Sequence, residues 1–85
     1  MILNFSKASE KGYKDLPASI QVKADKQFHL LRSNYRHPSL RSRKMGGKNV
    51  FEARIDIHYR FSFQLGGKEI YVLTVGPHDI GLGKK

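Results

Sequence analysis

The sequence predicts one α+β domain over residues 1–85, with two N-terminal helices packed on one face of a small, mainly antiparallel sheet of four or five strands. The first observation behind this prediction is length, since 85 residues can enclose only one core. The second is composition, because 39% hydrophobic and 11% aromatic residues suffice for a packed interior. The third is order: helical spacing of apolar residues in the first half gives way to alternation in the second.

The first two elements are short. Residues 1–5 carry an apolar pattern that predicts a strand. Ser6 is a suitable N-cap for a helix over residues 7–14, because its hydroxyl can accept a hydrogen bond from a backbone N–H that the first turn leaves free. Gly12 is expected to weaken this helix, since glycine is less favourable than alanine in a helix interior.

A longer second helix opens at residues 15–17, with Pro17 in its first turn, where no backbone donor is missed, and ends near Ser33-Asn34. A basic loop over residues 35–49 follows, and a brief strand is expected around residues 43–45. The apolar residues of the helix recur every three or four positions and form one stripe for burial: Ile20, Ala24, Phe28 and Leu31.

The second half of the chain alternates between apolar and polar residues, which predicts half-buried strands. One face carries Phe51, Ala53, Ile55 and Ile57, and then Tyr59, Phe61, Phe63 and Leu65. The other carries Glu52, Arg54, Asp56 and His58, and then Arg60, Ser62 and Gln64. A tight turn is expected near residues 56–58, and Gly66-Gly67 is a hairpin signal. Residues 69–75 are apolar on both faces, which predicts a central strand covered on both sides.

The chain is strongly basic. Its 16 Lys and Arg residues against 7 Asp and Glu residues give a formal net charge of +9. A charge this large on so small a body favours a polyanionic partner, namely nucleic acid, an acidic protein or an anionic membrane surface. Charge alone does not choose among these three.

Composition also argues against several kinds of site. The chain has no cysteine, so it has no disulfide, no thiolate zinc site and no cysteine nucleophile. Its 4 histidines lack close metal-ligand spacing, and no metal or other cofactor is expected. No apolar run approaches the roughly 20 residues of a membrane-spanning helix. The N-terminus does not resemble a signal peptide, so the expected location is the cytoplasm, with no membrane partner.

The polar face of the predicted sheet is the first candidate site. Adjacent strands place Arg54, His58 and Arg60 side by side there. An antiparallel sheet normally has one wet face, which is often charged, so the alternative is a purely structural one. In that alternative Glu52 and Asp56 are cross-strand partners of the two arginines.

A second candidate lies where the last strand ends. His78 and Asp79 follow Gly76-Pro77, and the ends of strands can offer side chains to a ligand. The imidazole of a histidine titrates near pH 6.5, which suits proton transfer at neutral pH. The alternative for these residues is a solvated polar tail.

The basic loop is the candidate surface for a phosphate backbone, because lysine and arginine neutralise phosphates and release counterions. The alternative is a loop that is only solvated. The candidate contacts are His37, Arg41, Arg43, Lys44 and Lys48, with Asp79 beside them at the strand end.

Five short motifs, in order over nearly the whole chain, resemble the RelE/ParE superfamily of bacterial type II toxins, and most closely its YafQ-like and RelE-like mRNA interferases. Each motif alone is short, but their order, the chain length and the charge agree. They are Leu16-Pro17 at a helix start, HPSLR at residues 37–41, FEARI at residues 51–55, YRFSF at residues 59–63 and VGPHD at residues 75–79.

The resemblance implies a RelE-like fold and an endoribonuclease that cleaves mRNA on the ribosome and so inhibits translation. By motif, Arg60 matches the arginine of the family's Tyr-Arg pair, and Arg54 a basic residue of the preceding strand. His78 matches the basic residue just after the last strand and is the first choice for general acid or base; His58 is the second. Relatives often carry an aromatic residue further on, whereas residues 80–85 contain none.

The resemblance also implies partners. These are an acidic antitoxin encoded beside the toxin, the mRNA, and the ribosome. Two other functions stay open. The ParE branch shares the fold and poisons DNA gyrase without cleaving RNA, and a basic domain of this size can also be a non-catalytic RNA-binding module.

Overall fold

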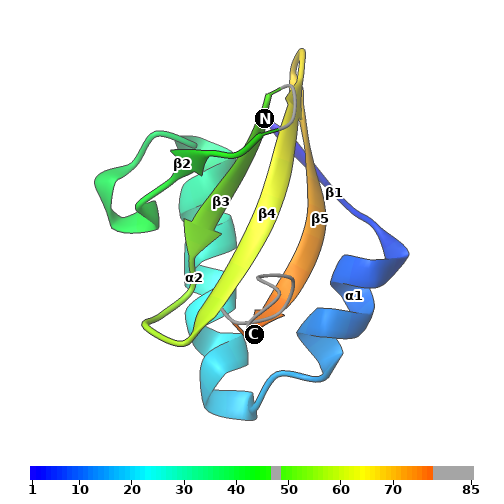
Figure 1. Cartoon of the computed structure of the whole chain (residues 1–85), viewed down its shortest axis with the longest axis vertical. Helices are drawn as coiled ribbons and strands as arrows, with labels where there is room; N and C mark the ends of the chain where they lie inside the picture. Colours follow the sequence, from blue (N-terminus) through cyan, green and yellow to red (C-terminus); the bar gives the residue numbers. More distant parts are fainter. Residues whose placement is uncertain (47–48, 78–85) are drawn as a thin grey trace.

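The computed structural model describes residues 1–46 and 49–77. Two helices and a five-stranded sheet make up this part of the chain (Figure 1). A one-turn 3₁₀ helix, η1, connects α2 to the short strand β2. In chain order the elements are β1 (Ile2–Phe5), α1 (Lys7–Lys14), α2 (Ala18–Ser33), η1 (Pro38–Leu40), β2 (Arg43–Lys44), β3 (Val50–Arg54), β4 (Tyr59–Gly66) and β5 (Glu69–Pro77).

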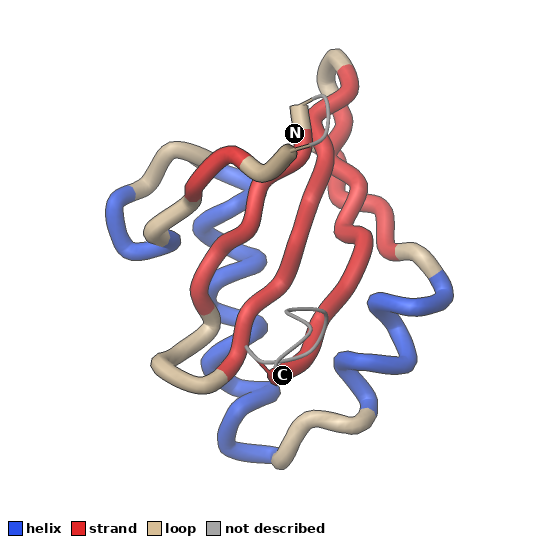
Figure 2. Tube along the Cα trace, viewed as in Figure 1, coloured by secondary structure: helices blue, strands red, loops and turns tan. Residues whose placement is uncertain are grey.

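The predicted α+β fold class is confirmed. The strands lie in the order β1-β5-β4-β3-β2, and only the β1–β5 pair is parallel. β2 to β5 form an antiparallel meander because short connections join each strand to the next. β1 instead precedes both helices in the chain and lies at the edge of the sheet beside β5, opposite the β2 edge (Figure 2).

Both helices pack on one face of the sheet. The stripe predicted on α2 is buried there, and Phe28 makes an edge-to-face contact with Phe61 of β4 at a centroid distance of 5.0 Å. Phe28 also contacts Phe5 of β1 and Tyr13 of α1, so one aromatic ring connects both helices with two strands of the sheet. Within the described ranges, no helix is long and apolar enough to cross a membrane.

The N-terminus of α1 forms as predicted. Ser6 has an extended backbone, and its Oγ accepts a hydrogen bond from the Ser9 N–H at 3.0 Å. The Ser6 hydroxyl also donates to the Leu73 carbonyl at 2.8 Å. The cap therefore both starts α1 and ties it to β5, which adds a tertiary contact to a local signal.

Gly12 has a role that its helix propensity does not reveal. It lies where α1 crosses β5, and a Cβ atom at this position would sit 2.0 Å from the Val75 carbonyl oxygen. Only a residue without a side chain permits this approach. The local cost of glycine in α1 is thus offset by close packing of the helix on the sheet.

The prediction that residues 69–75 are covered on both sides is wrong. Ile70, Val72 and Val75 are buried, but Tyr71 between them is 39% exposed. The strand has a bulge: Phe63 pairs with Val72, and Ser62 pairs with Thr74, which leaves Leu73 without a direct partner. This extra residue shifts the alternation by one, so apolar residues on both sides of it face the same core.

A second difference concerns Ile57, which the alternation placed on the apolar face. Ile57 is 66% exposed, because β3 ends at Arg54 and residues 55–58 form a turn. Side chains alternate between the two faces of a sheet only within a strand, so the alternation does not predict the direction of a side chain in a turn. The turn itself is close to its predicted position.

Replacing Gly12 with alanine should destabilise the domain. Helix propensity alone predicts a gain of about 1 kcal/mol. The contact with the Val75 carbonyl instead predicts a loss of roughly 1–3 kcal/mol, because the helix and strand must move apart. Chemical denaturation of Gly12→Ala measures the sign, with the exposed Ala8→Gly in the same helix as the control for propensity. A more stable Gly12→Ala variant would contradict this packing.

Candidate functional site

The face of the sheet opposite the helices carries the polar side chains of the alternating strands. Arg54 of β3 lies directly across from Arg60 of β4, and Arg60 lies across from Gly76 of β5. The next row along the sheet contains Arg43, Glu52, Ser62 and Thr74. Gly76 has no side chain, so β5 places none beside Arg60 in the part of the chain that the structure describes.

A hollow of about 250 Å³ lies at the β2–β3–β4 end of this face. Four of the six residues around it are arginines and one is a glutamate, an excess of three positive charges. Such a surface attracts anions. The lining residues are Arg41, Arg43, Glu52, Ala53, Arg54 and Arg60.

The acidic residues near the hollow form ion pairs with residues other than Arg54 and Arg60. Glu52 is paired with Arg43, with 3.4 Å between Glu52 Oε1 and Arg43 Nε. Asp56 is paired with Lys23 of α2 at 3.4 Å. In the part of the chain that the structure describes, Arg54 and Arg60 therefore have no carboxylate partner. This differs from the structural alternative, in which Glu52 and Asp56 neutralise that pair.

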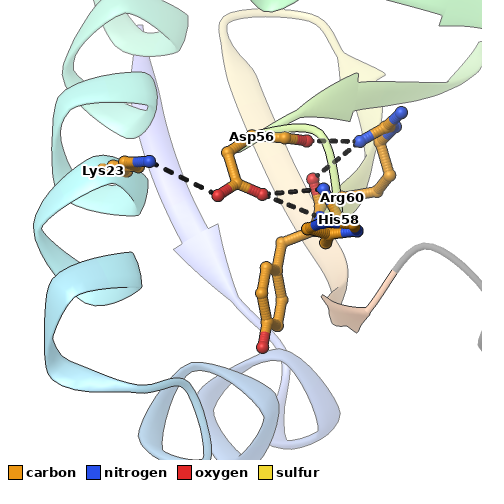
Figure 3. Close-up of polar contacts among 5 residues, drawn as sticks. Lys23, Asp56, His58 and Arg60 are labelled. Carbon is orange, nitrogen blue, oxygen red and sulfur yellow. Dashed lines mark hydrogen bonds and ion pairs between the residues drawn. The ribbon is translucent and has the colours of Figure 1, made fainter.

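The guanidinium of Arg60 is held by backbone carbonyls (Figure 3). Its Nη1 donates to the Asp56 carbonyl at 2.5 Å and to the Tyr59 carbonyl at 3.1 Å. A guanidinium has five N–H donors, and among the described residues the three on Nε and Nη2 have no hydrogen-bond partner. A planar fork of donors with a full charge suits the oxygens of a phosphate.

The Asp56 carbonyl lies in the turn between β3 and β4, and the Tyr59 carbonyl follows directly at the start of β4. The side chain of Asp56 closes this turn (Figure 3). Asp56 Oδ1 accepts hydrogen bonds from the backbone N–H groups of His58 at 2.8 Å and Tyr59 at 3.2 Å, and Oδ2 faces Lys23. These contacts lower the pKa of the Asp56 carboxyl, mainly through the His58 N–H and then through Lys23. Sequence reasoning missed this role, although an aspartate at a turn start is a known signal for it.

The structure brings Arg41, Arg43, Arg54 and Arg60 together around the hollow, whereas His58 lies outside its lining. His58 lies in the exposed turn after β3, and its side chain is not among those lining the hollow. The sequence pattern placed it on the polar sheet face, because the alternation was continued past Arg54, where the strand ends.

Two residues of the basic loop also lie away from this hollow. Lys44 pairs with Phe51, so it lies on the face opposite to Arg43. His37 caps η1, where its Nδ1 accepts the Ser39 N–H at 3.1 Å. It lines a separate hollow of about 470 Å³ together with Tyr35, and Arg41 borders both hollows.

Three candidates, His78, Asp79 and Lys48, lie outside the described residues. The last described strand residue, Pro77, pairs with Tyr59, one position beyond the Arg60–Gly76 pair. Among the described residues, no group of three or more His, Asp or Glu side chains is arranged to hold a metal ion.

The turn should make stability depend on pH in the acid range. Because the pKa of Asp56 is lowered in the folded state, its contribution to the free energy of unfolding is complete above the unfolded value near 3.9. It is lost as the pH falls through the lower folded pKa. Asp56→Asn should therefore flatten the stability curve between about pH 5 and pH 2, as thermal melts at several pH values can measure. Asp15→Asn, at the exposed C-cap of α1, is the control, and equal effects of both variants would contradict the assignment.

No protein-family model matches the chain, and no curated protein sequence matches it significantly. Solved structures do match its fold. The toxin in the Escherichia coli DinJ–YafQ toxin–antitoxin complex is 17% identical with a TM-score of 0.80, covering 95% of this chain and 96% of that one. The archaeal RelE–RelB complex from Pyrococcus horikoshii gives 17% identity and a TM-score of 0.79, with 94% and 97% covered.

The YoeB/ParE toxin from Agrobacterium tumefaciens is similar to the chain at 16% identity and a TM-score of 0.77, with 92% and 99% covered. Identities this low establish the fold and not the activity. The agreement extends over nearly the whole of each chain, so it includes the sheet with its open face as well as the helices. The chain therefore has the fold of the toxins of the RelE/ParE superfamily.

Proposed function

We propose that the chain is the toxin of a type II toxin–antitoxin pair and acts in the cytoplasm as an endoribonuclease on mRNA that is being translated. The observation that carries this proposal is the Arg54–Arg60 pair. These two cations lie side by side on the open face of a RelE-like sheet, without a carboxylate partner in the described chain. Like charges directly across a strand pair repel each other, and a bound anion would offset this repulsion.

The reaction that fits this face is cleavage of RNA by its own 2′-OH. The 2′ oxygen forms a bond to the adjacent phosphorus while the bond from phosphorus to the 5′ oxygen breaks. A base takes the 2′-OH proton and an acid gives a proton to the leaving 5′ oxygen, so the products are a 2′,3′-cyclic phosphate and a 5′-OH. These steps need proton transfer and stabilisation of charge on the phosphoryl oxygens.

The residues of the chain divide between these tasks. Arg54 and Arg60 stabilise the negative charge that develops on the phosphoryl oxygens, as preorganised cations do. His78 is our first choice for the proton-transfer group and the exposed His58 the second. Each such group typically contributes about 10²–10⁴-fold to the rate.

The remaining basic residues are proposed to hold the substrate. Arg41 and Arg43 lie at the rim of the same hollow, where they can contact neighbouring phosphates of the RNA or of the ribosome. His37 and Lys44 are proposed as RNA contacts that contribute less, because they line other surfaces. Lys48 and Asp79, which lie outside the described residues, stay proposed RNA contacts from the sequence.

We further propose an acidic antitoxin as the protein partner. The net charge of +9 favours an acidic chain, and the solved structures similar in fold include toxins in complex with DinJ and with RelB. An antitoxin that covers the open face would block RNA and neutralise the arginines together.

Truncating the arginine pair should abolish toxicity without unfolding the domain. Arg60→Ala and Arg54→Ala each remove a half-buried cation from the hollow, so the cleavage rate should fall by about 10²–10³-fold. Growth after brief induction, with primer extension on a reporter mRNA, measures this effect. Arg32→Ala, an exposed residue in the last turn of α2, makes the same charge change outside the site and should stay toxic.

The wild-type protein separates the alternatives in the same experiment. Cuts within codons support the proposed function. Growth arrest with intact mRNA and inhibited gyrase would support the ParE-type alternative. Binding of RNA without cuts or arrest would leave a basic RNA-binding module.

The two residues of β2 should differ in their effect on RNA binding. Arg43 faces the hollow, and Lys44 faces the opposite side of the sheet. Arg43→Gln should therefore reduce the slope of the logarithm of the RNA-binding constant against the logarithm of the salt concentration by roughly 0.7–0.9, and Lys44→Gln should reduce this slope by less. Titration of a short single-stranded RNA at several salt concentrations measures both slopes. Equal reductions would show that the loop binds through general charge and not through this face.

A further inference from the structure

A line of polar contacts crosses the protein from the helix layer to the open face. It begins at Lys23 on α2, passes through Asp56 in the turn between β3 and β4, and ends at the guanidinium of Arg60 (Figure 3). We propose that Asp56, anchored by Lys23, is a positioning residue that fixes Arg60 for the phosphate. This inference rests on the proposed function for its consequence, but its geometry can be tested separately.

Asp56 acts on Arg60 through two different groups. Its carboxylate closes the turn by accepting the N–H groups of His58 and Tyr59. Its carbonyl, with that of Tyr59, accepts both hydrogen bonds from Arg60 Nη1. Since the Asp56 carbonyl lies in the turn and the Tyr59 carbonyl lies at the start of β4 directly after it, the turn that the carboxylate closes decides where the guanidinium lies.

Arg60 needs such a support because of its neighbour. Arg54 lies directly across the strand pair, and like charges in that position repel each other. An arginine side chain is also long and flexible. Without the two carbonyls, Arg60 would turn away from Arg54 into solvent, and a phosphate would have to order it again on binding.

The helix α2 supports both arginines from the buried side. Lys23 and Gln27 lie one helical turn apart on it. Lys23 pairs with the Asp56 carboxylate, and the Asp56 side chain is only 17% exposed. The amide of Gln27, a residue that is 7% exposed, donates to the Arg54 carbonyl at 2.8 Å and to the Ser39 carbonyl at 3.1 Å. One face of α2 thus contacts both the backbone of Arg54, through Gln27, and the turn that holds Arg60, through Lys23.

Arginine side-chain NMR tests the geometry without any activity. In the wild-type protein, Arg60 should show slow rotation of its guanidinium and separate Nη signals, because Nη1 is tied to two carbonyls. Asp56→Ala removes both carboxylate acceptors and should release these signals to fast averaging. Asp56→Asn keeps one acceptor oxygen and should retain them. A wild-type Arg60 that already averages like a free side chain would overturn the inference, even if Asp56→Ala fails to fold.

A double-mutant cycle then tests the consequence. Asp56→Ala should lower RNA cleavage by about 10–100-fold, as expected of a misplaced catalytic group, with Asp56→Asn restoring most of the loss. In an Arg60→Ala background the same Asp56→Ala change should cost almost nothing more, because the residue acts through Arg60. Additive losses in the cycle would show that Asp56 serves only the fold.

The ion pair has a matched control on the same molecule. Lys11 of α1 and Asp15, the C-cap of that helix, are also 3.4 Å apart and lie far from the arginines in sequence. Lys23→Gln should speed rotation of the Arg60 guanidinium and lower cleavage a few-fold, whereas Lys11→Gln should change neither. If the wild-type chain cleaves no RNA, the proposed function fails, and the NMR result still decides whether the turn holds Arg60.

Discussion

The packing of α2 on one face of the sheet is the interaction on which the rest of the structure depends. Phe28 and its neighbours on α2 bury against Phe61 and Phe63, and this burial determines which residues of the alternating strands face inward. The residues between them then have to face outward. The arginine pair Arg54–Arg60 is open to a ligand because the helices cover only the other side.

The same helix connects the core to the polar face. The apolar stripe of α2 holds it on the sheet, while Gln27 and Lys23 extend from it to the end of β3 and to the turn that follows. The charges at this end are not paired by simple proximity. Glu52 pairs with Arg43 and Asp56 pairs with Lys23, so Arg54 and Arg60, which lie across from each other on β3 and β4, have no carboxylate partner among the described residues. A stabilising core and an unneutralised site are therefore consequences of one arrangement.

Much of the fold and part of the site follow from local patterns in the sequence. The Ser6 cap and the placement of Arg54 and Arg60 on one face depend only on residue spacing, and the structure agrees with each. Other features depend on contacts between distant segments. The role of Gly12 needs the position of β5, and the partner of Asp56 is a lysine 33 residues away. Patterns within a segment carry no information about such partners.

The most direct test of the central claim is where a phosphate binds. An RNA trinucleotide whose reacting 2′-OH is replaced by hydrogen cannot be cut by the proposed route, so its complex can be studied at equilibrium. Titrating it into the ¹⁵N-labelled protein should shift the side-chain signals of Arg54 and Arg60 first and most strongly, with Arg41 and Arg43 following at the rim of the hollow. Shifts confined to the helix layer, or saturable binding that leaves the Arg54 and Arg60 signals unchanged, would contradict the account.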